Sequence, residues 1–342
     1  MTTGDKSGKG LALLQAEMAR QGADAVASLS SNGTVAAELA ASIARTGRVV
    51  LVGMGASHYA NRMVETSWRR LGVDCRAETA GDVLLQDLPG QPRTLVLVSQ
   101  SGESGEILQL LDLLPRSIDL FGMTLAPQST LGRSLSCLVG AGGQEVAFAA
   151  TRSLTVTLAL HAAVLAASGG DIGGFADVLA ASPQPVLDEA LEVLAPKSSV
   201  IIAGRGELRG LAEANGLMLM ELARIPAFGF EFGQFRHGPL EVLAPELGVL
   251  LLRGPGALSA GTATLANAAL GAGTTPVIFD CSGEAPLEGT VTVAFSRNEG
   301  LSAVATMLPA LQKLIIAVSG RKVAGVGEPV RSTKITGIDH EA

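Results

Sequence analysis

The chain has 342 residues, of which 47% are hydrophobic and only 3% aromatic, and its formal net charge is −7. This length exceeds the usual ceiling for one hydrophobic core and predicts two domains. The acidic balance argues against nucleic acid as a partner, because binding to a phosphate backbone needs basic patches. An anionic substrate would have to be held locally, by hydroxyl and backbone N–H groups.

The sequence shows no sign of secretion or of a membrane segment. The first ten residues are polar and glycine-rich, with no apolar run behind them. The longest uncharged apolar candidate, residues 153–168, is shorter than the roughly 18 residues that a spanning helix needs and is typical of a buried core helix. Three widely spaced cysteines fit neither a disulfide framework nor a zinc site. We therefore expect a cytoplasmic protein without membrane contact, metal or cofactor.

The first half of the sequence alternates between helical and strand patterns after an opening pair of helices. The predicted elements are helices over 11–27 and 34–45, strand 48–52, helix 59–71, strand 94–98, helix 106–114, strand 120–124 and helix 151–167. Gly53 and Gly55 form a turn after the first strand, and Pro115 ends the fourth helix. A strand, a glycine turn and a helix are half of a βαβ unit, which predicts a parallel sheet covered by helices.

The second half of the sequence repeats this plan. Strand 200–203 leads into Gly204 and a helix, and strand 249–252 leads into Arg253. The two strand ends are separated by nearly the same spacing as in the first half, which indicates an internal duplication. A proline pair within residues 182–185 marks the boundary. The sequence therefore predicts an α/β protein with two domains, each an α-β-α sandwich around a mainly parallel sheet.

The strongest functional signal is a polar loop between a predicted buried strand and a predicted helix. Residues 99–104 read Ser-Gln-Ser-Gly-Glu-Ser and are called the serine loop below. Backbone N–H groups and the dipole at a helix N-terminus attract anions, serine hydroxyls add donors, and Gly102 permits close backbone approach. An ordinary cap by Ser101 or Ser104 is the alternative, but it explains only one serine. We predict one phosphate site per chain, because the second half has Arg253 at the equivalent position.

Three further residues are candidates for chemistry, each with a structural alternative. Glu221 lies in an apolar run, where desolvation would raise its pKa toward that of a general base, although an exposed position paired with Arg224 fits equally well. His237 precedes Gly-Pro, which places it on a loop or at a helix start. Lys334 lies in a polar C-terminal tail and could act only if that tail folds back over a pocket.

Taken together, these segments resemble the sugar isomerase (SIS) family. They are most similar to the isomerase half of glucosamine-6-phosphate synthase and to stand-alone SIS deaminases and deglycases. The matching segments, in the family's order, are Gly55-Ala-Ser57, the serine loop, residues 145–152, Glu221, Arg-His-Gly-Pro at 236–239 and Pro-Val-Arg-Ser-Thr-Lys at 329–334. The resemblance spans nearly the whole chain after about residue 45; the serine loop and the His-Gly-Pro element are its most specific parts.

The resemblance implies a role for each matching position. The substrate-binding residues would be Ser57, Ser99, Gln100, Ser101, Ser104, Phe148 and Ala150. Glu221 would move a proton between C1 and C2, His237 from a neighbouring subunit would open the sugar ring, and Lys334 would form a Schiff base with an open-chain ketose. These roles imply a homodimer with shared active sites and a sugar phosphate as the ligand.

The resemblance also implies two tandem SIS domains and a closing tail. The N-terminal helices and the first SIS domain would occupy residues 1–182, the second SIS domain residues 183–326, and the tail residues 327–342. Three positions depart from the family pattern: Met218 replaces a lysine, Ala150 replaces a serine and Ala56 replaces a threonine. These changes leave the phosphate pocket unaltered and affect the end that recognises the sugar.

Three functions are compatible with this pattern. The first is an isomerase or deaminase acting on an amino-sugar or ketose 6-phosphate, of the glucosamine 6-phosphate to fructose 6-phosphate type. The second is a deglycase that releases an amine from a fructosamine-type phosphate, which the replacement at Met218 favours. The third is a non-catalytic phosphosugar sensor, which the presence of Glu221, His237 and Lys334 disfavours. The chain carries no glutaminase segment, so glutamine-dependent synthesis is not expected of it.

Overall fold

The computed structural model describes residues 8–86, 91–115 and 117–337, which fall into two compact units. Ala16–Ala180 and residues 329–337 form one, called the serine-loop unit. Ala181–Glu328 and residues 8–15 form the other, called the Glu221 unit. The division therefore groups the first residues with the second half of the chain, whereas the sequence placed them in the first domain.

The serine-loop unit is built on a five-stranded sheet in the order β2-β1-β3-β4-β5, with every pairing parallel. Its strands are β1 (Arg48–Gly53), β2 (Asp74–Thr79), β3 (Thr94–Val98), β4 (Asp119–Thr124) and β5 (Ser136–Val139). All of β3 and nearly all of β1 are buried, as expected for apolar strands covered on both faces. Gly53 pairs with Val98, so the carboxyl ends of these two central strands lie side by side.

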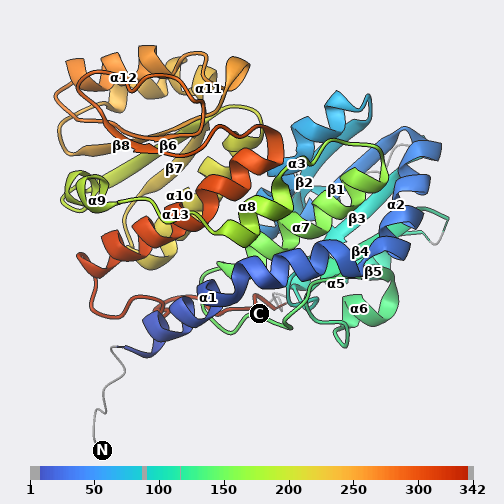
Figure 1. The fold of residues 1–342 in the computed structure, drawn as a ribbon. Helices are drawn as coiled ribbons and strands as arrows, with labels where there is room; N and C mark the ends of the chain where they lie inside the picture. The colour runs from blue at the N-terminus through green and yellow to red at the C-terminus, as the bar shows by residue number, and fades with distance from the viewer. Residues whose placement is uncertain (1–7, 87–90, 116, 338–342) are drawn as a thin grey trace, which may run out of the picture. The chain divides into compact units, whose positions relative to one another are not determined.

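Helices cover both faces of this sheet (Figure 1). One face contacts α2 (Gly33–Thr46), α3 (Gly55–Arg70) and α7 (Arg152–Ala167), and the other contacts α4 (Ala80–Leu84), α5 (Gly105–Leu113) and α6 (Thr130–Ser134). The unit also contains most of α1 (Lys9–Ser31) and of α8 (Phe175–Ala181). Residues 152–165 of α7 are all buried, which confirms that the longest uncharged apolar stretch is a core helix.

The Glu221 unit has a second parallel sheet in the order β10-β9-β8-β6-β7. Its strands are β6 (Ser199–Gly204), β7 (Ala227–Glu231), β8 (Leu247–Arg253), β9 (Val277–Asp280) and β10 (Val291–Ala294). Its helices are α9 (Asp188–Leu194), α10 (Glu207–Leu222), α11 (Phe232–Arg236), η1 (Pro239–Val242), η2 (Gly256–Leu258), α12 (Thr262–Gly271) and α13 (Gly300–Gly320). Counted along the chain, the strands follow the same order as in the serine-loop unit, which fits the duplication inferred from the sequence.

Helix α13 is the longest apolar helix among the described residues and was absent from the sequence prediction. By length and composition alone it could cross a membrane, yet 83% of its 18-residue apolar window is buried inside the structure. Its apolar residues pack against α10 and α9 of the same unit. This burial is typical of a core helix.

A buried histidine gives the serine-loop unit a specific acid sensitivity. His161 on α7 is 1% exposed, and its Nε2 lies 3.0 Å from Oδ1 of Asn61 on α3. Burial lowers the pKa of His161 to about 3. The folded state therefore excludes a proton that the unfolded chain binds below about pH 6.5. Stability contributed by neutral His161 is complete above that pH and is lost as the pH falls toward 3.

We expect the free energy of unfolding to fall by about 2 kcal/mol between pH 6.5 and pH 5 because of His161 alone, at about 1.4 kcal/mol per pH unit. Urea unfolding at pH 7, 6 and 5 measures this slope. In His161→Gln, an amide can still bond to Asn61 but does not titrate, so that part of the slope should disappear. Equal slopes for the wild type and the variant would contradict the assignment.

Candidate functional site

The serine loop lies at the carboxyl edge of the sheet, between β3 and α5. The backbone N–H of Ser99 bonds to the carbonyl of Met123 at 3.0 Å, which fixes the start of the loop to β4. The hydroxyls of Ser99 and Ser104 lie 2.9 Å apart, and Ser99 Oγ also accepts from the N–H of Gly102 at 3.1 Å. The loop thus turns on itself and directs its serines to the N-terminus of α5, where an anion is favoured.

The hydroxyls of this loop are not used as a simple helix cap. Ser104 is the residue before α5, but its side chain makes no capping hydrogen bond to the helix. Ser101 Oγ accepts from the N–H of Glu103 at 3.2 Å, within the loop. Glu103 extends away to α6, where its carboxylate accepts from the N–H and hydroxyl of Thr130. Ser99, Ser101 and Glu103 therefore shape the loop, and Ser104 does not form the side-chain cap that was the alternative interpretation.

Gly102 is required by both conformation and space. Its φ of +67° lies in the left-handed region, and a Cβ there would stand 1.9 Å from Ser129 Oγ. We expect Gly102→Ala to distort the loop and weaken the binding of fructose 6-phosphate by at least about tenfold, the equivalent of one lost hydrogen bond to a charged group. Isothermal titration calorimetry measures this.

Gly47→Ala is the matched control for this substitution. Gly47 has a φ of +64°, but a Cβ added there would have no atom within 4 Å. That variant should lose about 1 to 2 kcal/mol of stability from backbone strain and keep its affinity. Equal affinities for Gly102→Ala and the wild type would show that the loop does not bind the phosphate.

Ser57 approaches the same sheet edge from the neighbouring strand. It lies in the first turn of α3, directly after β1, and is 7% exposed. Gly53 makes this turn possible, because a Cβ there would lie 3.0 Å from the backbone N of His58. Since Gly53 pairs with Val98, Ser57 and Ser99 follow adjacent strand ends. Sites at such strand ends are the common place for ligands in parallel sheets.

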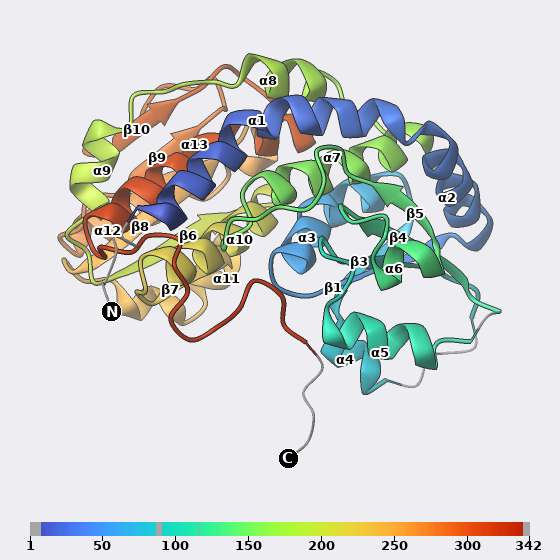
Figure 2. The same cartoon turned by 90° about the horizontal axis from the view of Figure 1, so that it is seen from below.

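The C-terminal tail is bound to this unit at two points. The carbonyl of Thr336 accepts from the N–H of Gly105, the first residue of α5, at 3.1 Å. Lys334 Nζ lies 3.2 Å from the carbonyl oxygen of Phe148 and 3.5 Å from Oε2 of Glu145. Figure 2 shows the red C-terminal segment running toward α4 and α5. Lys334, Phe148 and the serine loop are therefore brought together in one unit, as is Ala150, half-buried beside Phe148.

Glu145 is the residue of this region whose role the sequence analysis missed. It is 3% exposed and lies in the segment that precedes α7. Its Oε1 accepts from the N–H and the hydroxyl of Thr151 and from the N–H of Arg152, at 2.7 to 3.0 Å. A carboxylate at a helix N-terminus is stabilised by these donors and by the helix dipole. Only its place in the family motif singled it out, because a glutamate in a polar turn looks solvent-exposed.

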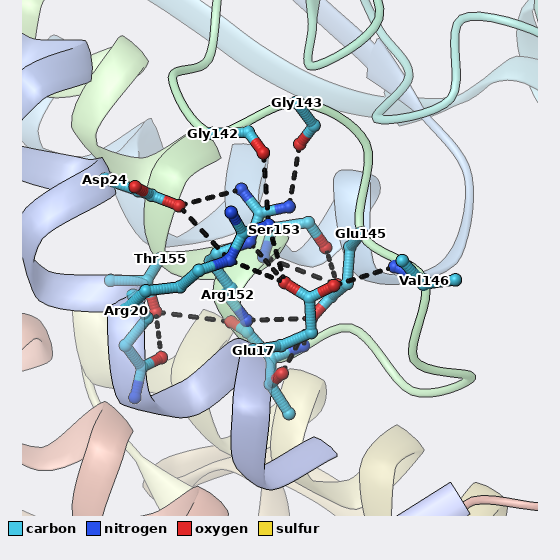
Figure 3. A network of polar contacts seen from close by, with 12 residues as sticks. Glu17, Arg20, Asp24, Gly142, Gly143, Glu145, Val146, Arg152, Ser153 and Thr155 are labelled. Atoms are coloured by element: carbon cyan, nitrogen blue, oxygen red, sulfur yellow. Dashed lines mark hydrogen bonds and ion pairs between the residues drawn. The ribbon is translucent and has the colours of Figure 1, made fainter. Parts of the chain in front are cut away.

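A buried arginine fixes the same segment to α1 (Figure 3). Arg152 is fully buried, and its Nε lies 2.6 Å from Glu17 while its Nη1 lies 3.2 Å from Asp24. Its remaining N–H groups donate to the carbonyls of Ala141 and Gly143. Burial raises the pKa of Glu17, but hydrogen bonds from the Val146 N–H and from Arg152 outweigh it and hold that pKa below its ordinary value. The segment carrying Glu145 and Phe148 is thus anchored from both ends.

Glu221 and His237 lie in the Glu221 unit. Glu221 is half-buried near the C-terminus of α10, next to the buried Leu222. Arg224, the alternative partner, donates to the carbonyls of Gly325 and Glu328. His237 is exposed and directly follows α11, before the turn of η1, so the predicted loop position is confirmed.

Within residues 8–86, 91–115 and 117–337, no group of three or more His, Cys, Asp or Glu side chains is placed to hold a metal ion. The polar groups that the serine loop, Ser57 and the tail bring into this unit are hydroxyls, amides, the Lys334 amine and the carboxylates of Glu103 and Glu145. Such a set suits a phosphate and a sugar, because hydroxyl and amide donors bind phosphate oxygens and sugar hydroxyls.

Comparison with known proteins gives relatives in sequence and in fold. No protein-family model matches the chain. The chain is 28% identical over 313 residues to glutamine–fructose-6-phosphate aminotransferase (isomerizing) of Gloeobacter violaceus, covering 82% of this chain and 50% of that enzyme. The chain thus spans about half the length of the curated relatives it matches.

Solved structures with the same fold include two sugar-phosphate enzymes. Tagatose-6-phosphate ketose/aldose isomerase from Escherichia coli has a TM-score of 0.79 at 17% identity, over 94% of this chain and 97% of that one. Glucosamine-6-phosphate deaminase from Thermotoga maritima has a TM-score of 0.70 at 19% identity, over 92% and 100%. At these identities the likeness shows the fold. Together with the sequence relatives, it confirms the resemblance to the sugar isomerase family drawn from the motifs.

Proposed function

We propose that this chain is a phosphosugar enzyme that interconverts aldose and ketose forms or deaminates an amino-sugar phosphate, of the glucosamine 6-phosphate to fructose 6-phosphate type. The observation that carries the proposal is the serine loop at the N-terminus of α5, with Lys334 of the tail bound in the same unit. A phosphate there would be held by hydroxyls and N–H groups without a basic patch, which suits a chain of net charge −7.

The chemistry needs groups with three separate tasks. In the proposal His237 opens the sugar ring, and Glu221 takes a proton from one of C1 and C2 and returns it to the other. Lys334 attacks the ketose carbonyl at C2, and loss of water gives an imine that holds the open-chain form. The phosphate, bound by Ser57 and the serine loop, would fix the distance from these groups to the reacting carbons.

The same proposal includes a homodimer, in which His237 acts across the subunit interface. Its support is the exposed position of His237 on a turn between α11 and η1. We also propose that the active protein has two tandem SIS domains and that its C-terminal tail closes over the site.

A deglycase acting on a fructosamine-type phosphate is the second candidate. Met218, where the family's synthases carry a lysine, is 4% exposed and packs within α10. Ala150 lacks the hydroxyl that would bind a sugar. A less polar sugar end would suit a substrate that carries an amine substituent.

A product screen tests the proposal and separates its forms. The purified chain is incubated with glucosamine 6-phosphate and with fructosamine 6-phosphates, and ammonia, ketose phosphate and free amine are measured. Ammonia with fructose 6-phosphate supports the deaminase, and a released amine supports the deglycase. If fructose 6-phosphate binds but no substrate turns over, the chain is a sensor and the enzyme proposal is wrong.

A further inference from the structure

Glu145 connects the tail to the serine loop through consecutive contacts. Its Oε2 lies 3.5 Å from Lys334 Nζ on one side and within hydrogen-bond distance of Ser153 Oγ on the other. Ser153 Oγ in turn lies 2.6 Å from Oε1 of Gln100, in the serine loop. The lysine proposed to react and the loop proposed to bind phosphate are thus joined through one carboxylate and one hydroxyl.

The direction of these hydrogen bonds follows from counting protons. Ser153 has one hydroxyl hydrogen, yet both of its neighbours, Gln100 Oε1 and Glu145 Oε2, are acceptors. Gln100 Nε2, meanwhile, is buried without a partner among the described residues. The two ends of an amide are interchangeable by rotation. Turning it lets Gln100 Nε2 donate to Ser153 and Ser153 donate to Glu145, so that each of these two contacts joins one donor to one acceptor.

The carboxylate of Glu145 is held in place by residues at the start of α7. Five hydrogen bonds come to it from Thr151, Arg152 and Ser153 at the start of α7. The side chain of Lys334 is 28% exposed, and that of Glu145 is 1% exposed. The Lys334 side chain is long and flexible, and contact with a carboxylate that is itself held by several hydrogen bonds gives its amine a defined position.

We propose that Glu145 is a positioning residue, which holds the Lys334 amine at the sugar site and couples it through Ser153 to Gln100 of the serine loop. This inference rests on the proposed function, in which Lys334 forms the Schiff base. The Phe148 carbonyl, 3.2 Å from Lys334 Nζ, provides the second contact and limits the lysine to one orientation.

The first test measures the position of Lys334 without any sugar. The full chain is treated with limiting acetic anhydride, and acetylation of Lys334 is compared by mass spectrometry with that of exposed Lys9. In the wild type Lys334 should react about fivefold more slowly than Lys9, the effect of one half-buried charged contact. In Glu145→Gln that protection should be lost. Equal rates for Lys334 and Lys9 in the wild type, or unchanged protection in the variant, would overturn the proposal.

The second test separates the contact of Glu145 with Lys334 from its contact with Ser153. With fructose 6-phosphate and borohydride, Glu145→Gln should reduce trapping at Lys334 by about tenfold while the dissociation constant changes by less than about threefold. Ser153→Ala should do the reverse, weakening sugar-phosphate binding while Lys334 stays protected from acetylation. If both variants change both quantities equally, Glu145 has only a structural role. A wild type that is protected but never trapped would refute the Schiff base and leave the contact established.

Discussion

Arg152→Met should lower the free energy of unfolding by about 3 to 5 kcal/mol, because it removes the buried cation from buried Glu17 and half-buried Asp24 and leaves them only the ion pairs with half-exposed Arg20. Glu17 is 4% exposed, and it accepts from Arg152 at 2.6 Å. Asp24 and two carbonyls lose their donors at the same time. Urea unfolding followed by circular dichroism measures the change, with the midpoint expected to fall and the slope to remain constant.

Two further variants isolate the cause of this effect. Arg209 makes an ion pair with Glu213 on the surface of α10, with 45% of its side chain exposed. Arg209→Met should therefore cost no more than about 0.5 kcal/mol. Adding Glu17→Gln to Arg152→Met should recover part of the lost stability, since a neutral amide is easier to bury than a carboxylate whose remaining ion pair is with half-exposed Arg20. If Arg152→Met costs as little as Arg209→Met, the buried network does not stabilise the unit.

Glu221→Gln should lower kcat by a factor of at least about 10² to 10⁴, the usual contribution of a positioned general base. The amide has the same shape as the carboxylate but cannot accept the proton that moves between C1 and C2. The serine loop belongs to the other unit. The dissociation constant for fructose 6-phosphate should therefore stay within about twofold, because the contacts that hold the phosphate are unchanged by the substitution. Turnover assays and calorimetry on the same preparation give both values.

The matched control for Glu221 is on the same helix. Glu213 lies two turns earlier on α10, and its carboxylate pairs with Arg209 at 2.9 Å. Glu213→Gln removes the same charge from α10 and should leave kcat unchanged. Equal losses in the two variants would indicate a general effect of charge on the helix, and undiminished activity in Glu221→Gln would exclude it as the base.

The sequence predicted β1, β3, β4, β6 and β8 because their apolar patterns are uninterrupted, but it did not predict the short buried strand β9. Strand 94–98 agrees with β3 residue for residue, and helices 34–45 and 106–114 agree with α2 and α5 to within one residue at each end. Edge elements were missed, since β2 and β10 carry polar residues at half-exposed positions and give no apolar run. Helix α13 was missed because Pro309 in its middle and serines near both ends obscure its period.

The candidate site was predictable where a motif is continuous in sequence. The serine loop, Ser57 and Lys334 were found because serine hydroxyls and a family motif mark them. The contacts from Ser153 to Gln100 and from Lys334 to Glu145 join residues 53 and 189 positions apart. No local pattern encodes such contacts, since they depend on how β3, α7 and the tail pack in the folded unit.

Deuterium incorporation into fructose 6-phosphate tests the central claim most directly. If the chain moves a proton between C1 and C2 of a sugar phosphate, incubation in D₂O should add one deuterium to the recovered ketose, because the base exchanges its proton with solvent. Mass spectrometry should detect it with the wild type, but neither with Glu221→Gln nor with unphosphorylated fructose. A wild type that binds fructose 6-phosphate and returns it without deuterium would contradict the proposed proton transfer on this ketose.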